Sequence, residues 1–397
     1  MSGMKCIADV GIEKYLKDTK EFEVGLLIGQ VVGKLGSDVI LTAVPTPPET
    51  HDSPLNKLQD LSIEWMMLHA KQVLAWLPGG IDCIGVYIAT KEDPTQVFTA
   101  VQLYLRALDD IKRSLNWLQD ARDEWSTMYV VVSTTGGSIS SRVAYKDHIP
   151  QTPVETKWQS TAGILQRFTA SVELHQEFAT TSDAVVANLR ARLIHQAKQV
   201  EDALAVPSDD SNTVIFLSRP GHDDLPSSSK AKSSAVAVLL GGISCVAYVP
   251  AKAKQHHVAA AYLKQDFLKS VAIRMDLLDE DLAHNDCNTS SPRTNFVLAR
   301  RASFPWISCG IASDFTGLVH ALPGETLGEC QSNVCEFLSS SIDDVAMSWL
   351  EDEPTTTADD DIDTSEEKKS VDAPPMYLLT ALAVLLVALA LLVLDVV

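Results

Sequence analysis

Basic residues are scarce in this sequence: 32 lysines and arginines stand against 52 acids, and the formal charge of the 397 residues is −20. The excess acid is concentrated between residues 351 and 372, where ten acids face only Lys368 and Lys369. The rest of the chain is moderately acidic and contains no basic stripe. Because proteins bind nucleic-acid backbones through clustered basic side chains, we expect no nucleic-acid partner.

A secretory signal peptide is also lacking. The apolar patch from Val24 to Ile28 is short and follows Glu21 and Glu23, whereas a signal peptide carries basic residues before its apolar core. We therefore expect the folded part to stay in the cytosol, which is a reducing compartment. There the seven cysteines are predicted to be thiols that mostly fill the core: Cys6, Cys83, Cys245, Cys287, Cys309, Cys330 and Cys335.

Motifs for metal-dependent chemistry are missing as well. No His-x-His pair occurs in the sequence, and the neighbours His256 and His257 would project about 100° apart on a helix, too far to chelate one ion together. Cys330 and Cys335 offer two thiols, but no second pair follows at zinc-ribbon spacing. We therefore expect no metal, no cofactor and no catalytic residues.

What the sequence does contain is one long apolar run, from Met376 through Leu385 to Leu394, without a charge. As a helix rising about 1.5 Å per residue it spans about 28 Å, close to the roughly 30 Å thickness of a bilayer core. Only three residues follow, so we expect a transmembrane tail anchor that inserts after synthesis and leaves the preceding residues cytosolic. A buried core helix is the alternative, which the neighbouring acidic run disfavours.

The length before the acidic run suggests two domains of ordinary size. We expect the first over residues 1–153 and the second over 154–350, with the proline-bounded stretch 150–153 between them. An acidic linker is predicted over 351–375, because that segment is too polar to fold and repels itself into an extended tether. The anchor then occupies 376–394.

Strands and helices alternate through the first half. In residues 61–77 apolar side chains recur every three or four positions, which predicts a helix with one buried face. The near-continuous apolar run 81–89 predicts a central strand that is covered on both faces. The alternation predicts an α/β fold. Further strands are expected over 23–28, 38–43, 128–133 and 142–145, with hairpin turns at 33–37 and 136–137 and a helix over 95–119.

The second half shows a similar pattern. The run 239–249 repeats the double glycine, isoleucine, cysteine and tyrosine of residues 77–88, and a long helix follows in both places. This similarity favours two related modules, with chance likeness of two buried strands as the alternative. Helices are expected over 183–204, 254–278 and 330–350, and strands over 165–174, 214–217, 239–249, 295–299 and 315–319.

This architecture resembles the MPN domain, the fold of the JAMM isopeptidases that remove ubiquitin-like tags. In active members a strand ends in Gly-Trp-x-His-x-His, and the two histidines hold zinc together with a downstream aspartate. The equivalent stretch here is 85–90, in which Ile88 and Thr90 stand at the ligand positions. Isoleucine has no lone pair for a metal, and a single hydroxyl is a poor zinc ligand. The resemblance therefore implies an MPN-like domain without metal ligands.

Short motifs are spread along the sequence, at residues 25–29, 46–48, 65–73, 77–80, 85–87 and 298–301. Together they resemble the odorant-response-abnormal protein 4 family, and the C-terminal apolar run fits the same family. The resemblance covers nearly all of the chain. It implies a single-pass endoplasmic-reticulum membrane protein that is not an enzyme and helps multi-pass receptors to fold or traffic. It also implies a partner, the cysteine protease specific for the ubiquitin-fold modifier.

These features predict a tail-anchored adaptor, a pseudoenzyme whose MPN-like domain pairs with the protease at the membrane and links the chain to ufmylation. Arg300 and Arg301 are candidates for a surface that binds an acidic partner, with a solvated loop tip as the alternative. Two other classes remain open. One is a divergent MPN-type hydrolase with an unrecognised site, and the other is a receptor-trafficking chaperone adaptor that acts without a protease.

Overall fold

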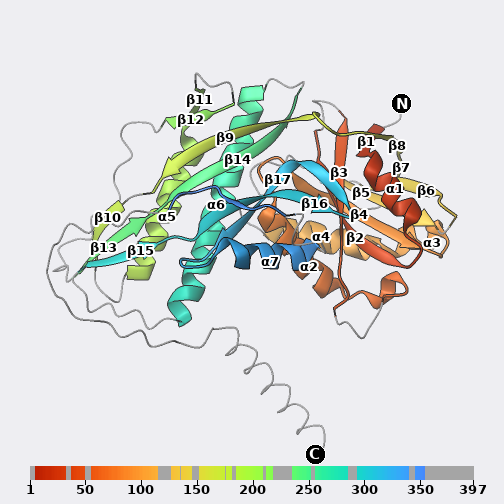
Figure 1. Ribbon diagram of the computed structural model, residues 1–397, viewed down its shortest axis with the longest axis horizontal. Coiled ribbons are helices and arrows are strands. Elements are labelled where there is room, and N and C mark those ends of the chain that lie inside the picture. Colours follow the sequence, from red (N-terminus) through yellow and green to blue (C-terminus); the bar gives the residue numbers. More distant parts are fainter. Residues whose placement is uncertain are drawn as a thin grey trace, which may run out of the picture. The chain divides into compact units, whose positions relative to one another are not determined.

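The structure is a computed structural model whose described residues all belong to one unit, Met1–Pro354. The second unit, Thr355–Val397, lies outside the described residues. Figure 1 shows the elements along the chain. The described residues are 5–32, 37–49, 55–114, 127–134, 136–144, 152–174, 176–180, 185–208, 212–217, 235–251, 255–284, 293–338 and 345–353.

The largest sheet has eight strands in the order β7-β6-β5-β4-β2-β3-β1-β8. Strand β4 lies in its middle, antiparallel to β2 and parallel to β5, and all nine of its residues are buried. Strand β8 pairs with β1 in parallel and forms one edge. The strands are β1 (Lys5–Asp9), β2 (Glu23–Gln30), β3 (Asp38–Pro45), β4 (Asp82–Thr90), β5 (Met128–Thr134), β6 (Ile139–Ala144), β7 (Thr152–Pro153) and β8 (Glu155–Gln159).

Helices cover both faces of this sheet. Helix α1 (Val10–Asp18) packs Ile12 and Leu16 with Tyr87 on one face. On the other face, α2 (Ile63–Trp76), α3 (Pro94–Ala100) and α4 (Gln102–Ser114) share a core with Val86 and Ile88 of β4. The short 3-10 helix η2 (Leu58–Asp60) precedes α2. Because successive strand side chains point to opposite faces, a strand covered on both sides is apolar throughout.

Helix α2 illustrates how the sequence sets an element. The Ser62 hydroxyl accepts the backbone N–H of Trp65 at 3.2 Å and so caps the first turn. Leu77 then takes an extended conformation, and Pro78, which cannot continue a helix, follows it. The buried residues repeat with the helical period: Met66, His69, Ala70, Val73, Leu74 and Trp76.

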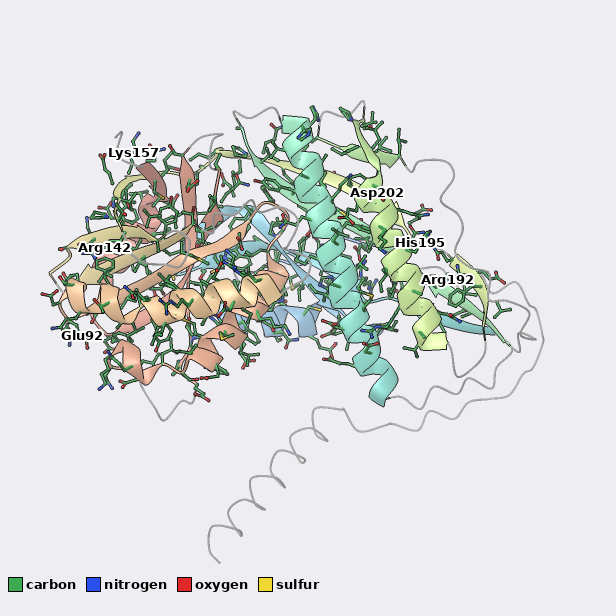
Figure 2. The ribbon with its side chains drawn as sticks, turned by 180° about the vertical axis from the view of Figure 1, so that it is seen from behind. Glu92, Arg142, Lys157, Arg192, His195 and Asp202 are labelled. Carbon is green, nitrogen blue, oxygen red and sulfur yellow. The ribbon has the colours of Figure 1, made fainter. Side chains whose placement is uncertain are left out.

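The second half contains a two-stranded pair, β9 (Leu165–Glu173) with β14 (Gly242–Pro250), and a three-stranded sheet of β10 (Gln176–Thr180), β13 (Ala235–Leu240) and β15 (Arg293–Val297). A small hairpin joins β11 (Leu204–Pro207) to β12 (Val214–Leu217). Helices α5 (Val185–Asp202) and α6 (Gln255–His284) lie side by side against these strands, as Figure 2 shows from behind. Their shared core includes Phe168, Leu193 and Phe267.

The last elements return to the first core. Strand β16 (Arg300–Ser308) pairs with β17 (Ile311–Ala321) and, over two residues, with β18 (Ser348–Trp349). Phe304 packs edge-on against Trp76 of α2, with ring centroids 6.1 Å apart. Helix α7 (Leu327–Leu338) adds Val334 to the same core. One continuous core therefore joins residues from both ends of the described chain.

The α/β character predicted from the sequence is confirmed, and so are the hairpin β2–β3 and the central position of β4. The helix expected over 95–119 is observed as α3 and α4, which meet at Val101; hydrogen bonds from Val101 N to Val97 O and from Leu105 N to Val101 O continue across the boundary. Residues 115–119 lie outside the described ranges.

Two predicted elements are wrong in extent. The single strand expected over 239–249 is divided at Gly241, whose φ of +151° separates β13 from β14, and these belong to different sheets. The helix expected over 330–350 ends at Leu338, and β18 follows as a strand. No strand was predicted for β1, β7, β8, β10, β11 or β16.

The predicted organisation at the C-terminus is only partly visible. No helix among the described residues is long and apolar enough to span a membrane, and the predicted anchor over 376–394, with Met376, Leu385 and Leu394, lies outside those residues. Glu351, counted with the acidic linker in the sequence, is buried and belongs to the folded unit. The division at residue 153 stays a prediction; β8, just beyond it, pairs with β1 of the first half.

Candidate functional site

The two positions expected to replace metal ligands lie within the central strand. Ile88 is fully buried in register between Val24 of β2 and Val132 of β5. Thr90 is 4% exposed, and its hydroxyl accepts the backbone N–H of Glu92 at 3.0 Å. Ile88 therefore contributes to the core, and Thr90 stabilises the turn that follows β4. Over the ranges described, no group of three or more His, Cys, Asp or Glu side chains could hold a metal ion.

The other sequence candidates lie apart from one another. His256 and His257 are exposed near the start of α6, where His256 packs edge-on against Phe168 with ring centroids 5.6 Å apart. Cys330 and Cys335 are buried on α7 as free thiols. Burial raises the pKa of the Cys330 thiol to about 11, so it is protonated at neutral pH.

Arg300 and Arg301, both candidates for a partner surface, begin strand β16 and have different surroundings. The Arg300 guanidinium lies 3.5 Å above the ring of Trp349, and its side chain is 20% exposed. Arg301 is fully buried. A partner that docks on the surface cannot reach the Arg301 side chain, so the expected surface is limited to Arg300, for which the role stays a prediction.

Arg301 belongs to a cluster of five buried ionisable side chains, which we call the charged junction: Asp266, Lys269, Arg274, Arg301 and Glu351. Arg301 Nη1 lies 3.0 Å from Asp266 Oδ2, and Arg301 Nε lies 3.5 Å from Glu351 Oε1. Arg274 donates to Glu351 Oε2, and Lys269 Nζ lies 3.6 Å from Asp266 Oδ1. Two carboxylates are thus shared among three basic side chains.

Electrostatics in the charged junction follow from this arrangement. Burial opposes ionisation of Arg301, but the neighbouring carboxylates of Asp266 and Glu351 outweigh it and raise its pKa. At Lys269 burial outweighs the carboxylate of Asp266 and, together with the charge of Arg301, lowers the pKa to about 8. Burial and the nearby arginines also hold the pKa of His320 well below its usual value, so that His320 is neutral.

The charged junction connects the two halves of the chain. Lys269 of α6 donates to the carbonyl of Leu77, at the end of α2. Two residues on, Gly79 N donates to Val246 O of β14 and Tyr248 N donates to Gly79 O, both at 2.9 Å. In the sequence, α6 and β14 come well after α2 and β4, as the colours of Figure 1 show. The two sequence stretches that resemble one another therefore contact each other directly.

Close approach at this contact requires glycine. A Cβ on Gly79 would lie 2.2 Å from Tyr262 O, and a Cβ on Gly80 would lie 2.4 Å from Tyr248 O. Gly80 also has a φ of +81°, which side chains rarely adopt. Gln30 of β2 completes the contact, because its Nε2 donates to both Gly80 O and Tyr248 O at 2.9 Å.

A second polar cluster lies on the opposite face of the large sheet. The hydroxyls of Tyr15 and Tyr87 both donate to Glu23 Oε1 at 2.7 Å. The turn between β16 and β17 is close by, with Cys309 at a φ of +55° and its thiol donating to Ala43 O. Burial raises the pKa of Cys309 to about 11, so its thiol is not an activated nucleophile.

A groove lies between β11 and the start of α6. Its volume is about 480 Å³, and it is mostly apolar, with Ala205, Val214, Ala260 and Ala261 in its lining. The outward face of the same hairpin exposes Leu204, Ile215 and Leu217 by 62%, 47% and 49%. Figure 2 places Asp202, Arg192 and His195 along the neighbouring helix α5.

Sequence reasoning did not identify the charged junction. Its members are far apart along the chain, from Asp266 to Glu351, and each resembles an ordinary surface charge in the sequence. One signal was available: Arg300-Arg301 stands directly after the apolar stretch 296–299, and a charge at the start of a buried strand needs a partner.

Comparison with solved structures finds a weak likeness that extends over most of the chain. The crystal structure of UfSP from C. elegans aligns with 85% of this chain and 56% of its own, at 7% identity and a TM-score of 0.38. A likeness at that TM-score supports no assignment of fold or activity. The MPN-like fold therefore stays a prediction.

Comparison with sequences is more informative. The human protein odr-4 homolog is 25% identical over 92% of this chain and 86% of its own length. The Xenopus tropicalis protein odr-4 homolog is 22% identical over 94% of this chain and 92% of its own length. The family described as ODR4-like, odorant response abnormal 4-like, matches residues 25–348. The chain therefore belongs to the ODR4-like family.

Proposed function

We propose that this protein is a non-enzymatic adaptor at the endoplasmic-reticulum membrane. Residues 376–394 anchor it as a single-pass tail anchor, and residues before the linker face the cytosol. The folded part recruits the cysteine protease specific for the ubiquitin-fold modifier and supports folding or trafficking of multi-pass receptors. The observation that carries this proposal is membership of the ODR4-like family over residues 25–348.

The described residues support binding rather than chemistry. The positions that the MPN resemblance assigns to zinc ligands hold Ile88, which is buried in the core, and Thr90, whose hydroxyl accepts a hydrogen bond in the following turn. Buried thiols such as Cys83 and Cys330 have pKa values raised by burial to about 11, which suppresses nucleophilic attack. The hairpin β11–β12 meanwhile exposes aliphatic side chains, as protein-binding surfaces do.

Affinity capture tests the proposal. The full chain, tagged at its N-terminus, is isolated from detergent-solubilised membranes, and the bound proteins are scored for the modifier-specific protease. We expect enrichment of the protease over a tag-only control. Absence of the protease from the captured proteins, with the chain itself recovered, would remove the recruitment role.

Two further measurements separate the adaptor from the other classes. Stoichiometric zinc in the purified chain, or labelling by a thiol-reactive modifier probe, would favour a divergent hydrolase. Loss of receptor delivery in cells that lack the chain but still retain the protease at the membrane would favour a chaperone adaptor that acts without the protease.

A further inference from the structure

The segment from Val345 to Glu351, within the last described range, is attached to the folded unit in an unusual way, and we call it the strap. Its strand β18 forms only two register pairs with β16, Ala302 with Trp349 and Ser303 with Ser348. One more backbone hydrogen bond runs from Leu350 N to Arg301 O, at 2.9 Å. This ladder is short, so the strap depends on its side chains.

The side chain of Glu351 makes four polar contacts with the rest of the fold. Its Oε1 accepts the backbone N–H of Ser244 in β14 at 2.9 Å, and its Oε2 accepts the backbone N–H of Arg301 in β16 at 2.7 Å. The same carboxylate pairs with the guanidinium groups of Arg274 and Arg301. A single carboxylate therefore connects three elements: α6, β14 and β16.

If Glu351 left the charged junction, the two arginines would lose a counter-charge and the two backbone N–H groups would lose an acceptor. Arg274 is 1% exposed and Arg301 is fully buried, and Asp266 would be the one carboxylate left beside Arg301 in the charged junction. Because buried unpaired charges and buried unpaired donors are both strongly unfavourable, the junction cannot keep its closed form once the strap leaves.

The effect extends to the contact between the two halves. Arg301 pairs with Asp266, Asp266 pairs with Lys269, and Lys269 donates to the carbonyl of Leu77 beside Gly79. A continuous chain of polar contacts thus runs from the strap to the loop after α2. A network of contacts of this kind couples two sites when its side chains switch together between two conformations.

We propose that the strap is a conformational latch: docking of Val345–Glu351 and closure of the charged junction are one coupled step. With Glu351 in place, α6, β14 and β16 are held together. With the strap released, Arg274 and Arg301 become accessible to water and the contact at Leu77–Gly80 loosens.

Hydrogen–deuterium exchange of the full chain tests the coupling. Glu351→Gln removes the charge and keeps the shape, whereas Glu353→Gln is the matched control, because Glu353 is 79% exposed and lies 3.8 Å from Arg300. We expect Glu351→Gln to raise exchange at least tenfold at the amides of Ser244 and Arg301 and across the Leu77–Gly80 loop. Glu353→Gln should leave all of these unchanged. Faster exchange confined to the strap itself would overturn the coupling.

A second measurement holds even where Glu351→Gln prevents folding. A protease site placed among residues 339–344 allows the folded full chain to be cut, so that the piece starting at Val345 is held only by non-covalent contacts. An excess of a synthetic peptide of residues 345–353 should then displace that piece, while the same peptide with Gln at 351 should not. Equal competition by both peptides would refute the latch.

Discussion

Arg301 Nη1 lies 3.0 Å from Asp266 Oδ2, and neither side chain exposes any surface to water. The two residues come from β16 and α6, which places one fully buried ion pair at the centre of the fold. Such pairs give little net stability over apolar residues of the same shape, but breaking one is costly, since the remaining charge stays buried.

Replacement of one member of this pair should therefore be severe. Arg301→Met is expected to lower the free energy of unfolding by about 3–5 kcal/mol, because it leaves Asp266 without its main counter-ion. Its neighbour provides the control: Arg300→Met loses a stacking contact with Trp349 and should cost only about 0.5–1 kcal/mol. Urea unfolding of both variants measures the difference, and equal losses would contradict the burial argument.

The contact between the halves should depend on the absence of a side chain at Gly80. Gly80→Ala brings a Cβ to 2.4 Å from Tyr248 O in addition to its positive φ. Gly137→Ala has a similar φ, +75°, but meets nothing within 4 Å. The control variant should lose about 1–2 kcal/mol from backbone strain alone, and Gly80→Ala clearly more. Equal melting temperatures for Gly80→Ala and Gly137→Ala would show that the backbone near Tyr248 O can move away from a side chain at position 80.

Ile88 should behave as a core residue. Ile88→Ala removes a fully buried side chain and should cost about 2–5 kcal/mol in unfolding free energy. Leu103→Ala, at a side chain 58% exposed on α4, should change stability by less than about 0.5 kcal/mol. A small loss at Ile88 in the same unfolding assay would mean that its surroundings collapse easily or are open.

Lys269 should make stability depend on pH. Burial lowers its pKa from 10.5 to about 8. Between pH 8 and about 9 the unfolded chain keeps this proton while the folded chain releases it, so stability rises with pH. The rise due to Lys269 is on the order of 1 kcal/mol, and Lys269→Met should remove it from urea-unfolding curves taken at the two pH values.

Other buried ionisable groups also change the stability over this pH range. Buried Lys112, whose pKa is also lowered to about 8, contributes a similar rise that Lys269→Met leaves in place. Above pH 9 buried thiols oppose this rise, since burial raises the pKa values of Cys83, Cys309 and Cys330 to about 11 and the unfolded thiols lose their protons first. Lys17→Met, at an exposed lysine, is the control and should follow the wild type. An unchanged slope in Lys269→Met would show that the buried lysine stays charged in the folded chain.

The anchor expected over 376–394 is tested at its centre. Leu385→Arg places a charge where insertion costs about 2.5–3.5 kcal/mol more, and should move the chain from the membrane pellet to the soluble fraction. Val397→Arg, beyond the apolar run, should leave the distribution unchanged. Retention of Leu385→Arg after carbonate extraction would argue against a membrane span.

Local pattern explains which parts of the fold were predictable. Helix α2 and strand β4 have clear periods of their own, so the positions of their buried residues could be predicted. Strand β16 begins with two arginines and contains Pro305, both of which suggest a loop when considered alone. Its burial depends on Asp266 and Glu351, whose proximity is a property of the tertiary fold.

The same limit applies to the candidate site. The prediction that Ile88 and Thr90 cannot bind a metal rests on residues within one short stretch, so it could be made from the sequence. The burial of Glu351 was not predictable, because the acids that follow it give the segment the composition of a disordered tether. Its role depends on two arginines, 77 and 50 residues earlier in the chain, which side-chain contacts bring to it.

The first core includes both Val24 and Val345. About 320 residues separate them, and at a synthesis rate of about 5–20 residues per second the ribosome needs roughly 16–64 s to supply the second after the first. During that interval the apolar faces of α2 and β4 lack the side chains of β16, β17 and α7 that cover them in the finished fold. Newly made chains should therefore depend on chaperones until the last folded segment has left the ribosome.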